Sequence, residues 1–211
     1  MQGLNSDSRG RRVHELLASI ESNEEKTKGI VGFFYRMYIN ETIKFLQDCQ
    51  GSLILDVGSG EGVILKDTCL KSVQIDISYK RLLDARKYNS SLICADAYKL
   101  PFKENCFECI LLIAILEHVR TPFEIIKEVY RVAKINAKIV ILIPNDINMS
   151  LGRALLFKFP PRYPGHLSFI TPCKLKVWLK DRFIVEQAYP LPFRNLGFAL
   201  GMYYFLVARK V

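Results

Sequence analysis

Short apolar runs alternate with segments of helical pattern through most of this chain, and that alternation restricts the fold more than any other feature. Runs of four to seven apolar-rich residues bounded by turn residues are typical of strands buried on both faces of a parallel sheet. The runs cover residues 53–57, 73–77, 92–95, 107–113 and 138–143. The intervening segments 79–88 and 122–133 favour helices. We therefore expect an α/β fold, with one doubly wound, Rossmann-like domain and helices on both faces of its sheet.

The two ends of the chain add further elements. Before the first strand, apolar residues recur at helical spacing between residues 13 and 50, and Gly29 and Gly32 should divide them into two helices. Residues 157–166 are rich in proline and aromatic residues and predict a loop over a site. Thr171 and Pro172 predict the start of a helix that ends near residue 180, followed by strands near 183–189 and 202–208. We divide this single domain into N-terminal helices at 1–50, which form part of a lid, and a core at 51–211.

Composition limits the protein's setting. The chain has 211 residues, 50% of them hydrophobic, which is enough for one full core. Its net charge of +9 favours anionic partners but does not bear on the fold. Six scattered cysteines and a polar N-terminus predict a cytoplasmic protein with reduced thiols. The longest apolar stretch, 196–208, is shorter than the roughly 20 residues of a membrane span.

A glycine-rich loop follows the first strand in the sequence LDVGSGEG, residues 55–62. A dinucleotide-binding loop of the form G-x-G-x-x-G would need glycine at Val63, so the spacing differs from that motif. Asp56 and Glu61 add negative charge where a pyrophosphate would otherwise sit, the latter at the start of an expected helix. The loop therefore suits a ligand that carries an amino group and a sulfonium.

Two more acidic residues stand at strand ends. Asp76 follows the second strand and could accept hydrogen bonds from ribose hydroxyls, whereas Asp96 follows the third and could read an adenine edge. A single acid at a strand end is more often a solvated residue. Because the carboxyl ends of parallel strands meet at one edge, the three acids together predict one ligand crevice.

The motifs resemble those of the class I S-adenosylmethionine-dependent methyltransferases, in particular a small-molecule group that includes quinone-biosynthesis enzymes. The resemblance covers about residues 50–211 and rests on LDVGSGEG, QIDIS, CADAYKLPF, ECILLIAILEHV, EVYRVAKINAKIVILIPN and HLSFITPCKLKVWL. It implies S-adenosylmethionine as cofactor and a seven-stranded, mostly parallel sheet with an antiparallel last strand.

The resemblance also implies roles for individual residues around the cofactor. Asp56 and three glycines would hold the methionine part, and Asp76 the ribose. The three glycines are Gly58, Gly60 and Gly62. The resemblance further implies that Ile77, Asp96 and Ala97 lie at the adenine, and that Ile113 and Ala114 lie at the methionine end.

Methyl transfer from a sulfonium is an in-line displacement, so positioning contributes much of the catalysis. A nucleophilic acceptor needs no catalytic residue. A hydroxyl or an acidic carbon benefits from a general base, for which His118, Asp146 and His166 are candidates and His166 is preferred. The alternative is that His118 packs the turn after the fourth strand and that His166 orders its loop.

Specialised chemistries lack their residues. Methyltransferases that act on amino groups of bases carry an Asn/Asp-Pro-Pro-aromatic motif after the fourth strand, where this chain has residues 114–117, AILE. Cys106 and Cys109 precede that strand's end, so they do not provide a thiolate for attack on cytosine. Their spacing suits zinc, but no further ligands complete a site, and no metal is predicted.

Aromatic residues on both sides of the core suggest a lid over a moderately apolar small molecule. These residues are Phe33, Phe34, Tyr35, Tyr38, Phe157, Phe159 and Tyr163. Core packing of an N-terminal helix explains the first four equally well. Basic residues in the last third keep an RNA or protein methyltransferase open as an alternative, and a non-catalytic cofactor-binding relative is a third hypothesis.

Overall fold

The protein is built on one seven-stranded sheet with the strand order β3-β2-β1-β4-β5-β7-β6. The computed structural model describes residues 29–211 except 67, 89–90, 158 and 196. Each neighbouring pair among β1 to β5 is parallel, and β7 runs antiparallel to both of its neighbours. The strands are Ile54–Val57 (β1), Ser72–Asp76 (β2), Ser91–Cys94 (β3), Phe107–Ile113 (β4), Ala133–Pro144 (β5), Phe183–Leu191 (β6) and Tyr203–Lys210 (β7). The predicted mostly parallel sheet with an antiparallel last strand is confirmed.

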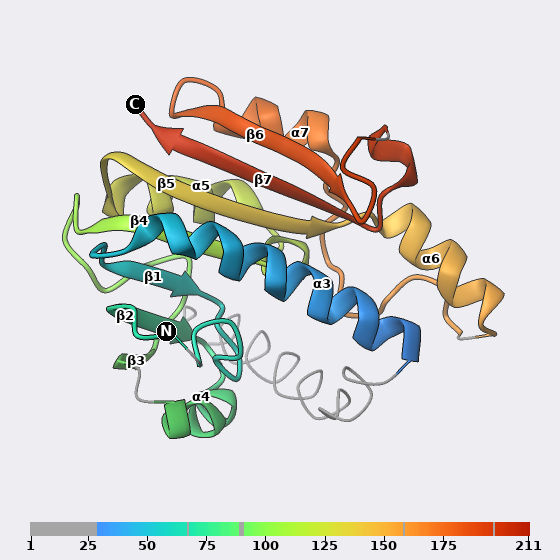
Figure 1. Ribbon diagram of the computed structural model, residues 1–211, viewed down its shortest axis with the longest axis horizontal. Helices are drawn as coiled ribbons and strands as arrows, with labels where there is room; N and C mark the ends of the chain where they lie inside the picture. The colour runs from blue at the N-terminus through green and yellow to red at the C-terminus, as the bar shows by residue number, and fades with distance from the viewer. Residues whose placement is uncertain (1–28, 67, 89–90, 158, 196) are drawn as a thin grey trace, which may run out of the picture.

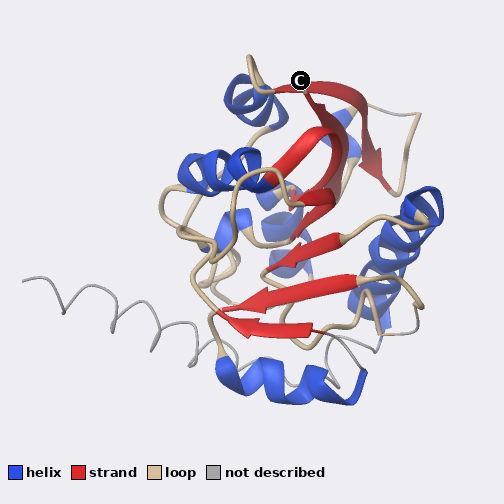
Figure 2. Ribbon diagram, turned by 90° about the vertical axis from the view of Figure 1, so that its left-hand side faces the viewer, coloured by secondary structure: helices blue, strands red, loops and turns tan. Residues whose placement is uncertain are grey.

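Helices cover both faces of the sheet (Figures 1 and 2). The helix α3 (Gly29–Leu46) packs on one face, and α5 (Pro122–Val132) and α7 (Pro172–Leu179) pack on the other. Helix α4 (Tyr79–Ala85) lies near β2 and β3, and α6 (Asp146–Leu155) extends away from the end of β5 (Figure 1). Single 3-10 turns are η1 (Gln47–Cys49), η2 (Arg86–Tyr88), η3 (Leu116–His118) and η4 (Phe198–Leu200).

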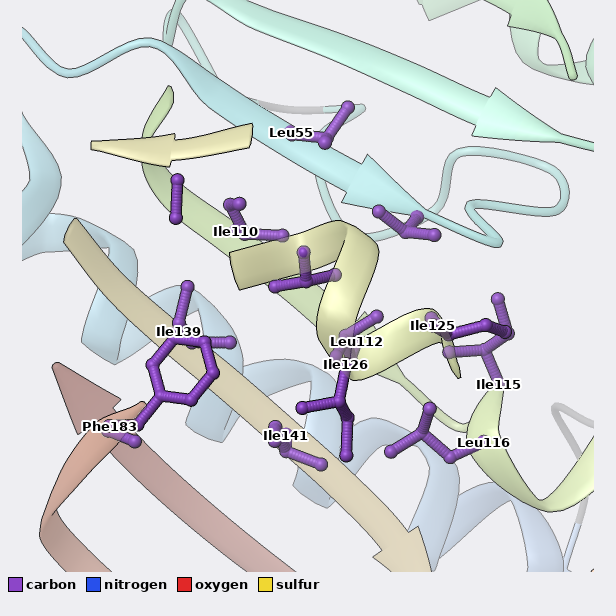
Figure 3. Packing of buried hydrophobic residues seen from close by; sticks show 14 of the residues in the cluster. Leu55, Ile110, Leu112, Ile115, Leu116, Ile125, Ile126, Ile139, Ile141 and Phe183 are labelled. Atoms are coloured by element: carbon purple, nitrogen blue, oxygen red, sulfur yellow. The ribbon is translucent and has the colours of Figure 1, made fainter. Parts of the chain in front are cut away.

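The central strands β1 and β4 and the second half of β5 are mostly apolar because both of their faces are buried. In β4, Ile110 and Leu112 belong to the cluster under α5 and α7, whereas Leu111 and Ile113 belong to the cluster under α3. Figure 3 shows the first cluster, in which Ile125 and Ile126 of α5 pack over side chains of β4 and β5. The two-sided burial explains why these strands lack an alternating polar pattern.

The prediction of a helix directly after the glycine loop is wrong. The described residues of the connection from Gly62 to Lys71 form turns and contain no helix. A crossover between parallel strands usually requires a dozen or more residues when it includes a helix. The connection from β1 to β2 has 14 residues, of which the glycine loop occupies the first five, and the remaining nine leave too little length for a helix and its flanking turns.

Three other expectations need revision or lie outside the structure. Gly32 does not break a helix, because it lies buried within α3, which begins at Gly29. The cost of a helical glycine is only about 1 kcal/mol, which packing on the sheet offsets. The helix expected between 13 and 28 lies outside the described residues, and α6 was not predicted at all.

None of the described helices combines the length and apolarity needed to cross a membrane.

A truncation in the core tests the two-sided burial. Ile141 in β5 is fully buried, whereas Ile135 in the same strand is 62% exposed. We expect Ile141→Ala to lower the free energy of unfolding by about 2–5 kcal/mol through lost burial and a residual cavity. The matched change Ile135→Ala should cost less than about 0.5 kcal/mol, as measured by urea unfolding. Equal losses at the two positions would contradict the assignment of β5 to the core.

Candidate functional site

The glycine loop leaves β1 in a backbone conformation that needs glycine. Gly58 has a φ of +73°, and a Cβ built there would lie 2.5 Å from Cδ1 of Ile115. Gly62 has a φ of +70°, and its Cβ would lie 2.5 Å from Oε1 of Gln74. The first and third glycines are therefore required both by conformation and by space, since other residues rarely adopt this region.

Asp76 at the end of β2 holds the loop in place. Its Oδ2 accepts a hydrogen bond from the backbone N–H of Gly60 at 2.8 Å, and its Oδ1 accepts one from the N–H of Ser78 at 2.8 Å. The sequence predicted only a ribose contact for this carboxylate. Each carboxylate oxygen has a second lone pair, so both bonds leave capacity for ribose hydroxyls.

Asp56 is buried beneath the loop without a complete set of partners. It is 2% exposed, and no hydrogen bond to its Oδ2 is present among the described residues. Burial and, secondarily, the nearby charge of Asp76 raise the pKa of Asp56 to about 7. The hydroxyl of Ser59 is likewise buried without a described partner. Such unsatisfied oxygens fit a ligand that brings N–H donors and positive charge.

The other predicted cofactor contacts lie along the same edge. The N–H of Ala95 donates to the carbonyl oxygen of Asp76 at 3.2 Å, which holds the end of β3 beside that of β2. Oδ1 of Asp96 accepts a hydrogen bond from the N–H of Tyr98 at 2.9 Å. Two further predicted residues, Ile77 and Ala97, directly follow Asp76 and Asp96 in the chain.

Ala114 follows the end of β4 in a conformation that is uncommon for a residue with a side chain. Its φ is +52°, and its N–H donates to the carbonyl oxygen of Leu142 at 3.0 Å. The last residue of β4, Ile113, is buried. Left-handed backbone at a non-glycine residue is concentrated at functional sites, where surrounding contacts hold it.

The three candidate bases come together from separate segments. Nδ1 of His166 lies 2.5 Å from Oδ1 of Asp146, and both side chains are less than a tenth exposed. Nδ1 of His118 lies 2.9 Å from the carbonyl oxygen of Gly165. The two imidazole rings meet edge to face with centroids 5.1 Å apart. These contacts join η3, the start of α6 and the loop before α7 at the carboxyl ends of β4 and β5.

Glu117 belongs to the same cluster, although its role was not predicted. It is 2% exposed, and its Oε2 has no hydrogen-bond partner among the described residues. Burial raises the pKa of Glu117 to about 8, with a smaller contribution from Asp146. One ligand atom each from Glu117, His118 and His166 lie within 4.8 Å of one another. The adjacent Glu117 and His118 were visible in the sequence, but nothing there paired them with a histidine 48 residues later.

The expected aromatic lid is only partly found near this cluster. The ring of Tyr163 lies 5.1 Å from that of His166, centroid to centroid. Phe157 and Phe159 are 85% and 71% exposed. In α3, Tyr38 packs on Tyr203 of β7 with centroids 5.3 Å apart, which agrees with core packing for that residue.

Comparisons with known proteins agree with this arrangement. Residues 55–141 match the family model described as a methyltransferase domain. The chain is 27% identical over 188 residues to a demethylmenaquinone methyltransferase of Lysinibacillus sphaericus, covering 82% of this chain and 76% of that protein. It is also 25% identical over 158 residues to the ubiquinone/menaquinone biosynthesis C-methyltransferase UbiE of Pseudomonas paraeruginosa, covering 67% and 61%. The chain spans about half, 47%, of a 33% identical uncharacterized protein of Methanocaldococcus jannaschii.

Solved structures share the fold. The PH0226 protein of Pyrococcus horikoshii superposes with a TM-score of 0.67 at 20% identity, covering 88% of this chain and 96% of the other. The family match over residues 55–141, the fold and the similar proteins together support a class I S-adenosylmethionine-dependent methyltransferase. Within that class it is similar to the quinone-biosynthesis enzymes.

The residues at the loop fit S-adenosylmethionine, the cofactor of the class. The buried Oδ2 of Asp56 could accept from the ammonium of the methionine part, and Asp76 keeps acceptor capacity for the ribose. At Gly58 and Gly62 a side chain would clash with the protein, so only glycine keeps this loop conformation. When bound, this cofactor supplies an electrophilic methyl group.

A substitution at the loop tests its backbone requirement. We expect Gly58→Ala to lower the free energy of unfolding by about 1–3 kcal/mol, since a Cβ would strain the positive φ and press on Ile115. Gly197→Ala provides the control, because Gly197 has an ordinary φ of −60° and open space around its Cβ position. Urea unfolding of both variants measures the difference, and a neutral Gly58→Ala would argue against the loop conformation.

Asp56 should make the stability of the protein depend on pH. Its folded-state pKa of about 7 lies above the ordinary value of 3.8, so the folded state binds this proton more tightly than the unfolded state. The stability contributed by protonated Asp56 is complete below pH 4 and is lost as pH rises toward 7, by at most about 1.4 kcal/mol per unit. The variant Asp56→Asn lacks this loss, so its stability relative to the natural protein should increase by about 1–3 kcal/mol between pH 5 and 7.5.

Urea unfolding at both pH values measures this change, with the exposed Asp84→Asn in α4 as control. Parallel pH dependences of the natural protein and Asp56→Asn would show that Asp56 titrates normally.

Proposed function

We propose that the protein transfers a methyl group from S-adenosylmethionine to a small, moderately apolar acceptor by in-line displacement. The observation that supports this most is the division of one sheet edge into two adjoining parts. The glycine loop, Asp56 and Asp76 stand at the ends of β1 and β2, and the cluster of Asp146 and the two histidines stands at the ends of β4 and β5. The first part suits the cofactor and the second suits an acceptor.

The cofactor contacts in this proposal follow the strand ends. The residues proposed around the methionine part are Asp56, Gly58, Gly60, Gly62, Ile113 and Ala114. The other proposed residues surround the adenosine. Those remaining residues are Asp76 at the ribose and Ile77, Asp96 and Ala97 at the adenine. Support comes from the hydrogen bonds that hold these strand ends together.

We propose that His166 is the catalytic side chain that activates the acceptor. Its Nδ1 is engaged by Asp146, which leaves Nε2 as the nitrogen that can act on a ligand. The carboxylate fixes both the orientation and the tautomer of the ring, as in other histidines that act on a reacting proton. Methyl transfer to a hydroxyl or an acidic carbon needs such activation because the neutral acceptor is a weak nucleophile.

The names of the relatives favour a quinone-related ring as acceptor. A demethylmenaquinone methyltransferase and a quinone-biosynthesis C-methyltransferase are among the similar proteins. The aromatic ring of Tyr163 beside His166 would suit a ligand of this kind. The six cysteines are free thiols, which supports the proposal of a cytoplasmic location.

Several basic residues in the last third of the chain, which suggested an RNA substrate, contact other residues of the protein. Nε of Arg153 donates to the carbonyl oxygen of Pro161 at 3.0 Å, and Nζ of Lys174 lies 5.0 Å from the ring centroid of Trp178. Arg209 is paired with Glu186. These contacts give part of the basic surface a role in packing, and they favour the small-molecule acceptor.

Cofactor binding and methyl transfer test the proposal. S-adenosylhomocysteine at about 100 times its dissociation constant should stabilise the protein by about 2.7 kcal/mol. Asp76→Ala should weaken that binding by about 10- to 100-fold, because charge-assisted hydrogen bonds to ribose and to the loop are lost. Asp84→Asn is again the control, and calorimetric titration measures both affinities. Stabilisation by NAD instead of S-adenosylhomocysteine would overturn the cofactor assignment.

Transfer itself is measured with cofactor carrying a labelled methyl group and a panel of hydroxylated aromatic compounds. We expect His166→Ala to lower the turnover number with little change in S-adenosylhomocysteine affinity, since it acts on the acceptor. If no compound in the panel or in a cell extract accepts the label, the proposed activity is wrong.

A further inference from the structure

We propose that Glu117, His118 and His166 bind a divalent transition-metal ion at the carboxyl ends of β4 and β5. Each side chain offers one ligand atom, and the three atoms lie within 4.8 Å of one another. Two of the residues come from η3 and the third from the loop before α7. This inference rests on the proposed function for its role, and it specifies how His166 activates an acceptor.

The distances are close to those of an assembled site. Ligand atoms about 2.1 Å from an ion lie about 3.0–3.5 Å from one another at octahedral or tetrahedral angles, so three atoms within 4.8 Å need movements of up to roughly 1 Å per side chain to bind it. Two imidazoles and one carboxylate are a ligand set that suits zinc, cobalt, iron or manganese. The hard ions Mg²⁺ and Ca²⁺ prefer oxygen ligands and should bind poorly.

Both histidines already have the outer contacts that metal-binding histidines use. The Asp146 carboxylate meets Nδ1 of His166, and the Gly165 carbonyl oxygen meets Nδ1 of His118. A carbonyl oxygen only accepts, so Nδ1 of His118 donates the proton and Nε2 has the lone pair. A carboxylate or carbonyl on the far nitrogen orients the ring and strengthens it as a ligand.

Buried charge provides an independent reason for a cation. The Oε2 atom of Glu117 is fully buried, and none of the residues that the structure describes forms a hydrogen bond with it. Glu117 and Asp146 are 2% and 6% exposed, and within the described chain neither forms an ion pair with lysine or arginine. A buried carboxyl oxygen without a partner is costly, and Asp146 has His166 as its charged or hydrogen-bonded partner. A divalent ion would satisfy the unpaired oxygen and balance the charge.

Three protein ligands leave coordination positions for the acceptor. An acceptor hydroxyl bound there would release its proton to solvent more readily, because the ion stabilises the oxyanion. The oxyanion then forms the new oxygen–carbon bond as the carbon–sulfur bond of the cofactor breaks, and the sulfur retains the electron pair. In this reaction His166 contributes as a metal ligand positioned by Asp146.

The test is titration of the untagged, chelator-treated protein with Co²⁺, followed by the visible absorption of the bound ion. We expect one Co²⁺ per chain. Glu117→Gln and His166→Ala each remove a ligand and should lower the affinity at least about 100-fold, and Asp146→Asn should lower it about 10- to 100-fold. The control Glu124→Gln changes an exposed carboxylate of α5 and should leave the affinity unchanged.

Two results would overturn the metal site: no Co²⁺ binding by the natural protein, or unchanged affinity in Glu117→Gln and His166→Ala. A sulfur-to-cobalt charge-transfer band would also overturn it, because it would indicate cysteine ligands. Stabilisation by S-adenosylhomocysteine, measured on the same variants, shows that they are folded and separates the two proposals. Stabilisation without Co²⁺ binding would leave His166 as a general base, whereas Co²⁺ binding without stabilisation would overturn the proposed function instead.

Discussion

The parallel pairing of β1 with β2 and β4, and of β2 with β3, determines where everything else in this protein can act. Val57 lies opposite Ile75, and Asp76 lies opposite Cys94, so the strands end at nearly one level. The residues that follow are thereby brought to one edge without any direct attraction between them. Three carboxylates would repel one another in an unstructured chain, and the backbone ladders provide the force that holds them near each other.

The fold could be predicted because its causes are local. The central strands β1 and β4 and the second half of β5 have buried apolar runs that are typical of a parallel sheet covered on both faces. Thr171 with Pro172 marked the start of α7 through its capping chemistry, since the Thr171 hydroxyl accepts from the N–H of Lys174. The absence of a helix after the glycine loop was harder to predict from the sequence. Its absence depends on how much of the connection the glycine loop occupies, and the apolar pattern does not show where that loop ends.

The site was predictable only in part, for a similar reason. Asp56 and Asp76 each follow an apolar run and could be placed by position, but the bond from Gly60 to Asp76 depends on the exact path of the loop. His118, Asp146 and His166 were individual candidates in the sequence. Their meeting depends on how the loop before α7 folds back, where the N–H groups of Leu167 and Ser168 donate to the carbonyl oxygen of Glu117. Such long-range contacts leave no periodic signal.

One side chain lies between the two parts of this edge. The Ile115 side chain fills the space beside Gly58, and the turn that carries Glu117 and His118 begins one residue after Ile115. A ligand that displaced the backbone at Gly58 would press on Ile115, which precedes the first residue of the turn. In an enzyme with this arrangement, occupation of the first part of the edge would be coupled to the shape of the second, and the two substrates would then bind in a preferred order.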